Sequence, residues 1–142
     1  MEAKTLWNSL NAVIVAAGGW LGWYVGGWDG FLYALVVFVV MDYLTGIMCA
    51  TVDKNLSSEI GAKGIFKKVF IFALVGVGHT IDTYLIGAGG AVRTAVIFFF
   101  INNEGISLLE NAARLGLPIP PKLKNILKEL RANEQESGGS EE

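Results

Sequence analysis

Apolar residues gather into four long segments along the chain, and short polar or glycine-rich breaks separate these segments. They cover about residues 6–28, 31–51, 69–89 and 91–113. Each segment is about 20 residues long, enough to cross a hydrocarbon core of about 30 Å as an α-helix. A soluble bundle needs a polar face on each helix, and the first two segments have almost none. The pattern therefore predicts an all-α membrane protein with four transmembrane helices.

The breaks predict how these helices pair. Only Asp29–Gly30 separates the first two segments, and Gly89–Gly90 joins the last two. Turns this short place consecutive helices side by side, so we expect two antiparallel hairpins. A longer loop at 52–68 would connect the hairpins and include a short interfacial helix. The transmembrane domain would then occupy residues 1–117.

The first segment allows a second interpretation. Lys4, an apolar stretch and the small residues at 16–19 fit a cleaved signal peptide loosely. The apolar region continues past Gly19 to Trp28, which favours a retained helix. Small residues spaced by four allow two helix backbones to approach closely, within one chain or between two chains. The candidates for such helix packing are Gly18, Gly22 and Gly26.

The end of the chain follows a different pattern. Three prolines after Leu117 end the fourth helix, and apolar residues then recur at helical spacing with basic residues between them. This pattern predicts a short basic amphipathic helix on the anionic inner leaflet, or packed against a partner helix. Residues 118–142 would form a cytoplasmic region with a disordered acidic tail. The predicted membrane-surface residues are Lys67, Lys68, Lys122, Lys124, Lys128 and Arg131.

Composition agrees with a membrane protein and excludes several other classes. Of the 142 residues, 53% are hydrophobic and 17% are charged, against about 25% charged in soluble domains. The net charge of -2 gives no broad basic surface, so no nucleic-acid partner is expected. One cysteine and one histidine are too few for a structural zinc site. We expect no cofactor and no enzymatic activity, since no nucleophile elbow or P-loop occurs.

Basic residues predict the orientation. If all four segments span, Arg93 alone lies on one side and the other ten of the eleven basic residues lie on the opposite side. Cytoplasmic loops carry the excess of Lys and Arg. Both termini and the 52–68 loop are therefore predicted to be cytoplasmic.

Polar residues interrupt the spans near the middle of the bilayer. Ionisable residues at this depth face the bundle interior or water, and are functional candidates. Internal hydrogen bonds that fix helix packing are the alternative role, and Asp82 is within reach of pairing with Arg93 on the next helix. The candidates for pore lining or assembly are Asp42, His79, Asp82, Asn103, Glu104, Ser107, Glu110 and Asn111.

The fourth segment is the least favourable span. Its apolar residues contribute about -4 kcal/mol to insertion, and an ionised Glu104 at the centre offsets about 3 kcal/mol of this. Further amides and charged residues in this segment reduce the remaining favourable free energy of insertion. We therefore expect this helix to need polar partners from its neighbours.

Three motifs carry a resemblance. MDYLTGIMCA (41–50), LSSEIGAKGIFKKV (56–69) and FFFINNEGISLLENAARLGLPIPPKLKNIL (98–127) closely resemble the phage holin family, which includes holin-like proteins of toxin-secretion loci. The resemblance covers about residues 30–130. The family has no agreed catalytic residues. The polar positions that match its motifs are Asp42, Thr45, Ser58, Glu59, Lys67, Lys68, Asn103, Glu104, Ser107, Glu110 and Asn111.

The resemblance implies a multi-pass protein of the host bacterium's cytoplasmic membrane that forms homo-oligomers. Such proteins assemble into membrane lesions that release or activate an endolysin, without implied direct contact with it, and the host cell lyses. Two alternatives remain from the residues themselves. Buried carboxylates are also typical of a small proton-coupled transporter or channel, and the amphipathic tail suits a structural membrane subunit.

Overall fold

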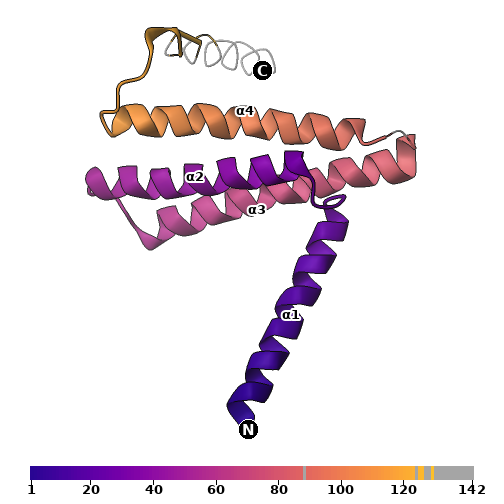
Figure 1. Cartoon of the computed structure of the whole chain (residues 1–142). Coiled ribbons are helices and arrows are strands. Elements are labelled where there is room, and N and C mark those ends of the chain that lie inside the picture. Colours follow the sequence, from indigo (N-terminus) through magenta and orange to yellow (C-terminus); the bar gives the residue numbers. More distant parts are fainter. Residues whose placement is uncertain (88, 124, 127–128, 130–142) are drawn as a thin grey trace.

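The computed structural model describes residues 1–87, 89–123, 125–126 and 129, and their regular structure is helical (Figure 1). In chain order the elements are α1 (Glu2–Tyr24), α2 (Gly30–Val52), α3 (Ser58–Thr80), the π-helix η1 (Ile81–Ile86) and α4 (Ala91–Arg114). Within this described part, three helices are long and apolar enough to cross a membrane: Gly30–Val52, Ser58–Ile86 and Ala91–Arg114.

These three helices form a bundle. Helices α2 and α4 run in the same direction and pack against each other, and α3 with η1 runs beside them in the opposite direction (Figure 1). The buried apolar core is small and consists of Val25, Leu32, Leu35, Val39, Ile71, Val75 and Ile97. Many large apolar side chains face outward instead, among them Val40, Met48, Phe70 and Phe99. An apolar exterior of this kind suits contact with lipid.

Helix α1 leaves the bundle at the start of α2 and points away from it (Figure 1). Gly22 is the one buried residue of α1. The expected hairpin of the first two helices and the fourth transmembrane span are therefore not confirmed. The end of α1 is nevertheless attached to α3, because the Tyr24 hydroxyl donates a 3.0 Å hydrogen bond to the Ala73 carbonyl.

The expected face of three glycines on the first helix is incomplete. Helix α1 ends at Tyr24, and Gly26 lies beyond it with φ +88°, in the left-handed region that glycine favours. Gly22 packs against the Trp28 indole, and Gly18 has no atom near the position of a Cβ. The close approach occurs on α3, where a Cβ at Gly76 would lie 1.9 Å from the Tyr24 ring.

Side-chain caps explain where two of the helices begin. The Asp29 carboxylate accepts a 2.8 Å hydrogen bond from the Leu32 N–H at the start of α2. The Ser57 hydroxyl accepts one of 3.2 Å from the Ile60 N–H at the start of α3. Both are common N-cap residues.

Helix α3 therefore begins at Ser58 and not near residue 69, so most of the expected 52–68 loop is helical. The lysines in this stretch lower its hydropathy, but lysine is a good helix former. In the C-terminal region, residues 121–123, 125–126 and 129 are helical, as the amphipathic pattern predicts, and Lys122 is exposed. Lys124, Lys128, Arg131 and the acidic tail lie outside the described residues.

Candidate functional site

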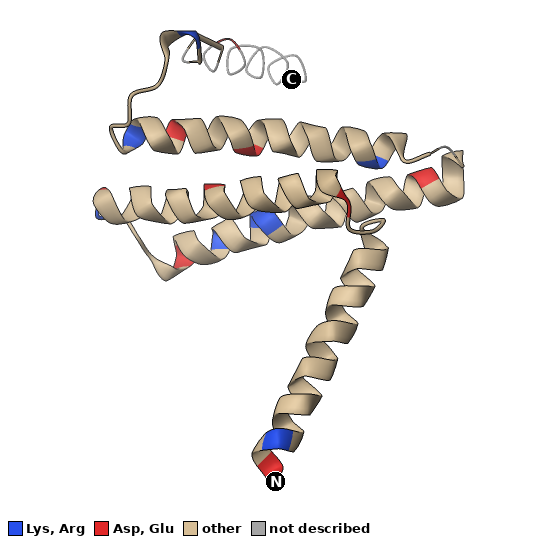
Figure 2. Ribbon diagram, viewed as in Figure 1, with Lys and Arg blue, Asp and Glu red and all other residues tan. Residues whose placement is uncertain are grey.

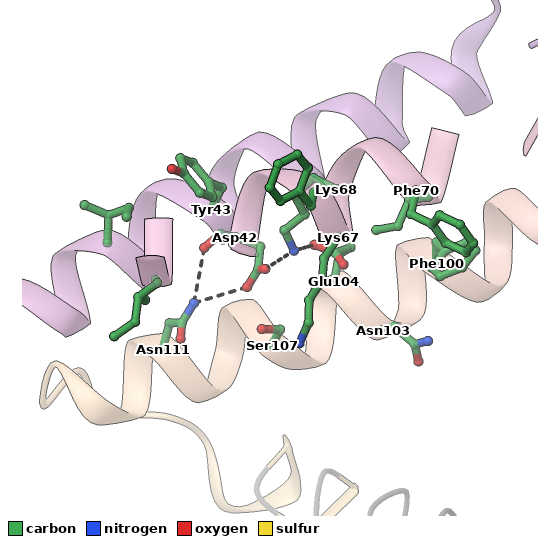
Figure 3. A pocket seen from close by; sticks show the side chains of 16 residues that line it. Asp42, Tyr43, Lys67, Lys68, Phe70, Phe100, Asn103, Glu104, Ser107 and Asn111 are labelled. Carbon is green, nitrogen blue, oxygen red and sulfur yellow. Dashed lines mark hydrogen bonds and ion pairs between the residues drawn. The ribbon is translucent and has the colours of Figure 1, made fainter. Parts of the chain in front are cut away.

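The central polar cluster joins the three helices of the bundle. The Lys68 ammonium group on α3 forms ion pairs with Asp42 on α2 and with Glu104 on α4 (Figure 3). The Lys68 side chain is 18% exposed, and each carboxylate side chain is 9% exposed. Three charges thus lie largely out of contact with solvent and neutralise one another in part.

Asn111 completes this cluster from the next turns of α4. Its amide nitrogen donates hydrogen bonds to Asp42 Oδ1 at 3.1 Å and to Thr45 Oγ1 at 3.0 Å. Lys68 binds the other carboxylate oxygen of Asp42. Both oxygens of Asp42 therefore have donors, as a buried carboxylate requires.

The cluster lies near the middle of the candidate spans. At a rise of 1.5 Å per residue, Asp42 is about 18 Å from the start of α2 and Glu104 about 20 Å from the start of α4. If all three groups are ionised, two carboxylates surround a single ammonium group. Charges at such depth are costly, and are normally paired and face protein or water.

A groove of about 760 Å³ is lined by the central cluster and by further residues of α2, α3 and α4. Asn103 and Ser107 contribute to it from α4, and Lys67 contributes from α3 (Figure 3). The structure thus brings together Asp42, Glu104 and Asn111 and places Asn103 and Ser107 along the adjoining groove. Glu110 is half-buried on α4.

Sequence reasoning missed the central role of Lys68. The excess of lysines between the second and third segments assigned it to the membrane surface, whereas its side chain lies inside the bundle. The available signal was charge balance, since two buried carboxylates on neighbouring helices require a cation. Lys67 is exposed, although it also lines the groove.

A second polar cluster lies around Arg93, at the end of the bundle where α2 and α4 begin. We call it the outer cluster because it lies away from the middle of the spans. The Arg93 guanidinium group donates hydrogen bonds to Asp29 Oδ2 at 2.7 Å, to the Gly27 carbonyl at 2.9 Å and to the Val25 carbonyl. Arg93 is 6% exposed, and the connection between α1 and α2 wraps around it. The hydrogen bond from Arg93 holds the pKa of Asp29 below its usual value.

Asp82 belongs to this outer cluster and caps α4. Its two carboxylate oxygens accept hydrogen bonds from the backbone N–H groups of Val92 at 3.0 Å and Arg93 at 2.8 Å. The expected pairing of Asp82 with Arg93 therefore occurs through the backbone and not through the guanidinium group. A carboxylate at this position also suits the positive end of the helix dipole.

His79 lies near Asp82 and Arg93, beside a polar cavity of about 580 Å³. Asp82 and His79 are therefore at the outer end, apart from the central cluster. About 20 Å of helix separates Asp82 from Lys68. Asp42 is one of the polar partners that the fourth helix was expected to need, whereas His79 does not contact the central cluster.

The other charged residues within the three spans lie in the first part of α3 and near the end of α4 (Figure 2), and they include Glu59, Lys63, Lys67 and Glu110. At the end opposite the outer cluster, Arg114 pairs with Asp53 and ties α4 to the connection between α2 and α3. Among the described residues, no group of three or more His, Cys, Asp or Glu side chains is placed to hold a metal ion.

Comparison with known proteins gives the class of this membrane protein. The chain belongs to the bacteriophage holin family, whose sequence model matches residues 19–132. This confirms the resemblance drawn from the three motifs.

The similar proteins come from bacteria and from a phage. The chain is 45% identical to an uncharacterised 14.9 kDa protein in the nagH 3' region of Clostridium perfringens, over 87% of this chain and 93% of the other. It is 41% identical to the uncharacterised protein BH0965 of Halalkalibacterium halodurans, over 94% and 98% of the two chains. A probable holin of Bacillus phage phi105 is 28% identical over 90% of each chain. No solved structure matches the chain.

Proposed function

We propose that this protein is a holin that oligomerises in the bacterial cytoplasmic membrane and permeabilises it. An endolysin or another large protein would then leave the cytoplasm, and the host cell would lyse. The observation that carries this proposal is the central cluster, in which side chains alone hold three charges together in the middle of candidate spans. The relation to a phage protein named probable holin also supports it.

The central cluster suggests how the chain can exist both as a single subunit and in an assembled lesion. In the single subunit, Lys68 neutralises the carboxylates and allows α4 to remain in the membrane. On assembly, the face of α4 that carries Asn103, Glu104 and Ser107 would turn toward water and line the lesion. Water would then replace the side-chain partners, so the two arrangements would differ little in free energy.

The proposal predicts that polar groups on this face set the time of lysis. Glu104→Leu leaves a balanced pair of Lys68 and Asp42, and Asn103→Leu removes one amide from the groove. Both variants should still insert, but lysis should be delayed severalfold or abolished because the lesion loses polar lining. Met48→Leu, a change on the apolar exterior of α2, is the matched control. Normal lysis times in both test variants would contradict this role.

The proposed orientation has the C-terminus and the connection between α2 and α3 in the cytoplasm, with the basic C-terminal segment on the inner leaflet. The start of α1 would also be cytoplasmic. Since α2 would begin at the outer side of the membrane, this requires α1 to cross the membrane as well. A reporter that is active only in the cytoplasm, fused before Met1, should therefore be active. An inactive reporter at that end, with an active one after the C-terminus, would instead place α1 on the outer surface.

The function itself is tested by timed induction in a bacterium that carries a cytosolic cell-wall hydrolase without a signal sequence. Membrane potential and turbidity are followed together. A silent delay, then abrupt depolarisation and clearing that depends on the hydrolase, is expected. Depolarisation without clearing would indicate a small pore or a proton-coupled channel. Steady growth with intact potential would indicate a transporter or a scaffold and overturn the proposal.

A further inference from the structure

Asn102, an amide residue in the middle of α4, has no role in the clusters described above. Asn102 is exposed, unlike its neighbours Asn103 and Glu104. Its side chain makes no hydrogen bond to the described part of the chain. At 1.5 Å per residue it lies about 17 Å from the start of α4 and about 18 Å from its end. A polar side chain is thus presented to the outside at the depth where water is least available.

Around the axis of α4, Asn102 lies opposite the buried face of the helix. The buried residues of α4 are Arg93, Ile97, Glu104 and Asn111. With 3.6 residues per turn, their mean direction lies about 180–200° from that of Asn102. Asn102 therefore points directly away from its own bundle, and no rotation of its side chain brings it to the central cluster.

The rest of this outward face is apolar. Within about 60° of Asn102 on the helical wheel it carries Ala95, Phe98, Phe99, Ile106 and Leu109. The first three are exposed and the last two are half-buried, and one edge of the face is covered where Phe98 packs against Phe31 of the same chain. Lipid chains can cover the apolar residues but offer neither donor nor acceptor to the amide. An amide without a partner in hydrocarbon costs free energy, so the face is best covered by another helix with a polar group at the same depth.

We infer that this face of α4 binds the same face of a second copy of the chain, with the two Asn102 side chains hydrogen-bonded to each other. All copies have the same orientation in the membrane, so a symmetry axis between them lies along the membrane normal. Identical residues then meet at identical depth. A carboxamide is its own complement, because it carries both a donor and an acceptor. One polar residue in an apolar helix face is also known to fix register between helices.

The inference deepens the proposed function, because it names the contact through which assembly begins. It rests on that function only for its consequence in lysis. The contact itself has an independent readout, which is the fraction of covalently cross-linked dimer in membranes.

Cysteine cross-linking of the full chain in native membranes tests the interface. Cys49→Ser removes the one native cysteine, and single cysteines then replace Ala95, Phe99 or Ile106 on the outward face. A cysteine at Ser107, which lines the groove of its own chain, is the control position. Mild oxidation should yield dimer at the three outward positions and little at residue 107. The strongest cross-link at residue 107 would overturn the inference.

The amide is tested in the same background with a cysteine at Ala95. Asn102→Leu should lower the dimer fraction about threefold to tenfold, the range given by interhelical hydrogen bonds of about 0.6–1.4 kcal/mol. Asn102→Gln should retain most of it, and Asn103→Leu should change it less than twofold. A dimer fraction that is unchanged by Asn102→Leu would overturn the inference.

Timed lysis of the same variants separates the two proposals. Less dimer together with delayed lysis supports the interface and its part in assembly. Less dimer with lysis on schedule supports the interface but shows that lysis does not depend on it. Unchanged dimer with normal lysis overturns the interface and leaves the proposed function intact.

Discussion

The two polar clusters of the bundle differ in what surrounds their charges. Around Arg93, most partners are backbone groups of the connection between α1 and α2, and this cluster lies where the chain turns. Around Lys68, both ion-pair partners are carboxylates on other helices, in the middle of the candidate spans. The outer cluster therefore fixes how chain segments connect, whereas the central cluster fixes which helix faces meet.

This difference predicts that the contacts of the two clusters differ in the free energy needed to break them. Water at the membrane surface can replace the partners of Arg93 when its contacts break. No water is present at the centre of an intact bilayer, so the charges around Lys68 separate only if the membrane itself is breached or another chain supplies partners. The central cluster therefore suits a part of the molecule that changes state once. The outer cluster suits a connection that keeps its shape.

The largest expected effect follows from Lys68→Met. This change leaves the carboxylates of Asp42 and Glu104 side by side without their cation. Breaking a buried pair costs about 3–5 kcal/mol, and we expect about 3 here because the Lys68 side chain is 18% exposed. The thermal midpoint of the detergent-solubilised chain should fall and protease resistance should be lost.

The control for this prediction neutralises the whole cluster. Lys68→Met combined with Asp42→Asn and Glu104→Gln should recover most of the lost stability, because no unpaired charge remains. If the triple variant is as unstable as the single one, packing and not charge governs this region, and the distinction between the two clusters fails.

A smaller effect is expected from Arg93→Met in the outer cluster. It removes the donors to Val25, Gly27 and Asp29, at about 2 kcal/mol for hydrogen bonds from a charged group that water can partly replace. The attachment of the α1 end should loosen. In the Cys49→Ser background, a cysteine at buried Val25 should react about 30-fold faster with a maleimide.

Arg93→Lys is the matched control, because it keeps the charge but not the planar fork of donors. Its labelling rate should fall between those of the parent and Arg93→Met. Equal rates in all three proteins would show that Arg93 does not hold this connection.

The smallest expected effect is the pH dependence of the Asp29–Arg93 pair. The pKa of Asp29 is lower in the folded chain than its usual value of 3.8. Its contribution to stability is therefore complete above pH 4 and is lost as the pH falls through the lowered pKa. The Asp29 side chain is 42% exposed, so this contribution stays below about 1 kcal/mol.

Asp29→Asn should remove this dependence. The labelling rate of the cysteine at Val25 is divided at each pH by the rate of an unstructured cysteine peptide, because the thiolate fraction falls in acid. Between pH 5 and pH 3 this ratio should rise for the parent but stay flat for Asp29→Asn. Parallel curves for the two proteins would assign the acid response to another group.

The sequence predicted two of the helices closely, because the apolar segments and the short polar or glycine-rich breaks agree on where these helices begin and end. The expected spans 31–51 and 91–113 differ by only one residue at each changed end from Gly30–Val52 and Ala91–Arg114. It misplaced the start of α3, because hydropathy alone treats each lysine as a surface residue. Lys68 is tolerated inside only because Asp42 and Glu104 reach it from other helices, and no local pattern records such a contact.

The candidate site was predicted in part for the same reason. Mid-span depth selected Asp42 and Glu104, which the structure brings together through Lys68. Depth did not separate them from Asp82 and His79, which lie at the outer end around Arg93. The direction of α1 was not predictable either, since a short Asp29–Gly30 break permits both a closed hairpin and the open arrangement that Arg93 and Tyr24 hold.

The length of the candidate span formed by α3 and η1 has a mechanical consequence. From Ser58 to Ile86 it contains 29 residues, against 23 in α2. At 1.5 Å per residue these lengths are about 43 Å and about 34 Å, while the hydrocarbon core is about 30 Å thick. Figure 1 shows α3 inclined to both α2 and α4, which is how a long helix reduces hydrophobic mismatch. Each copy would still thicken the bilayer around it, and copies that gather would share one deformed rim, so membrane elasticity itself would favour crowding.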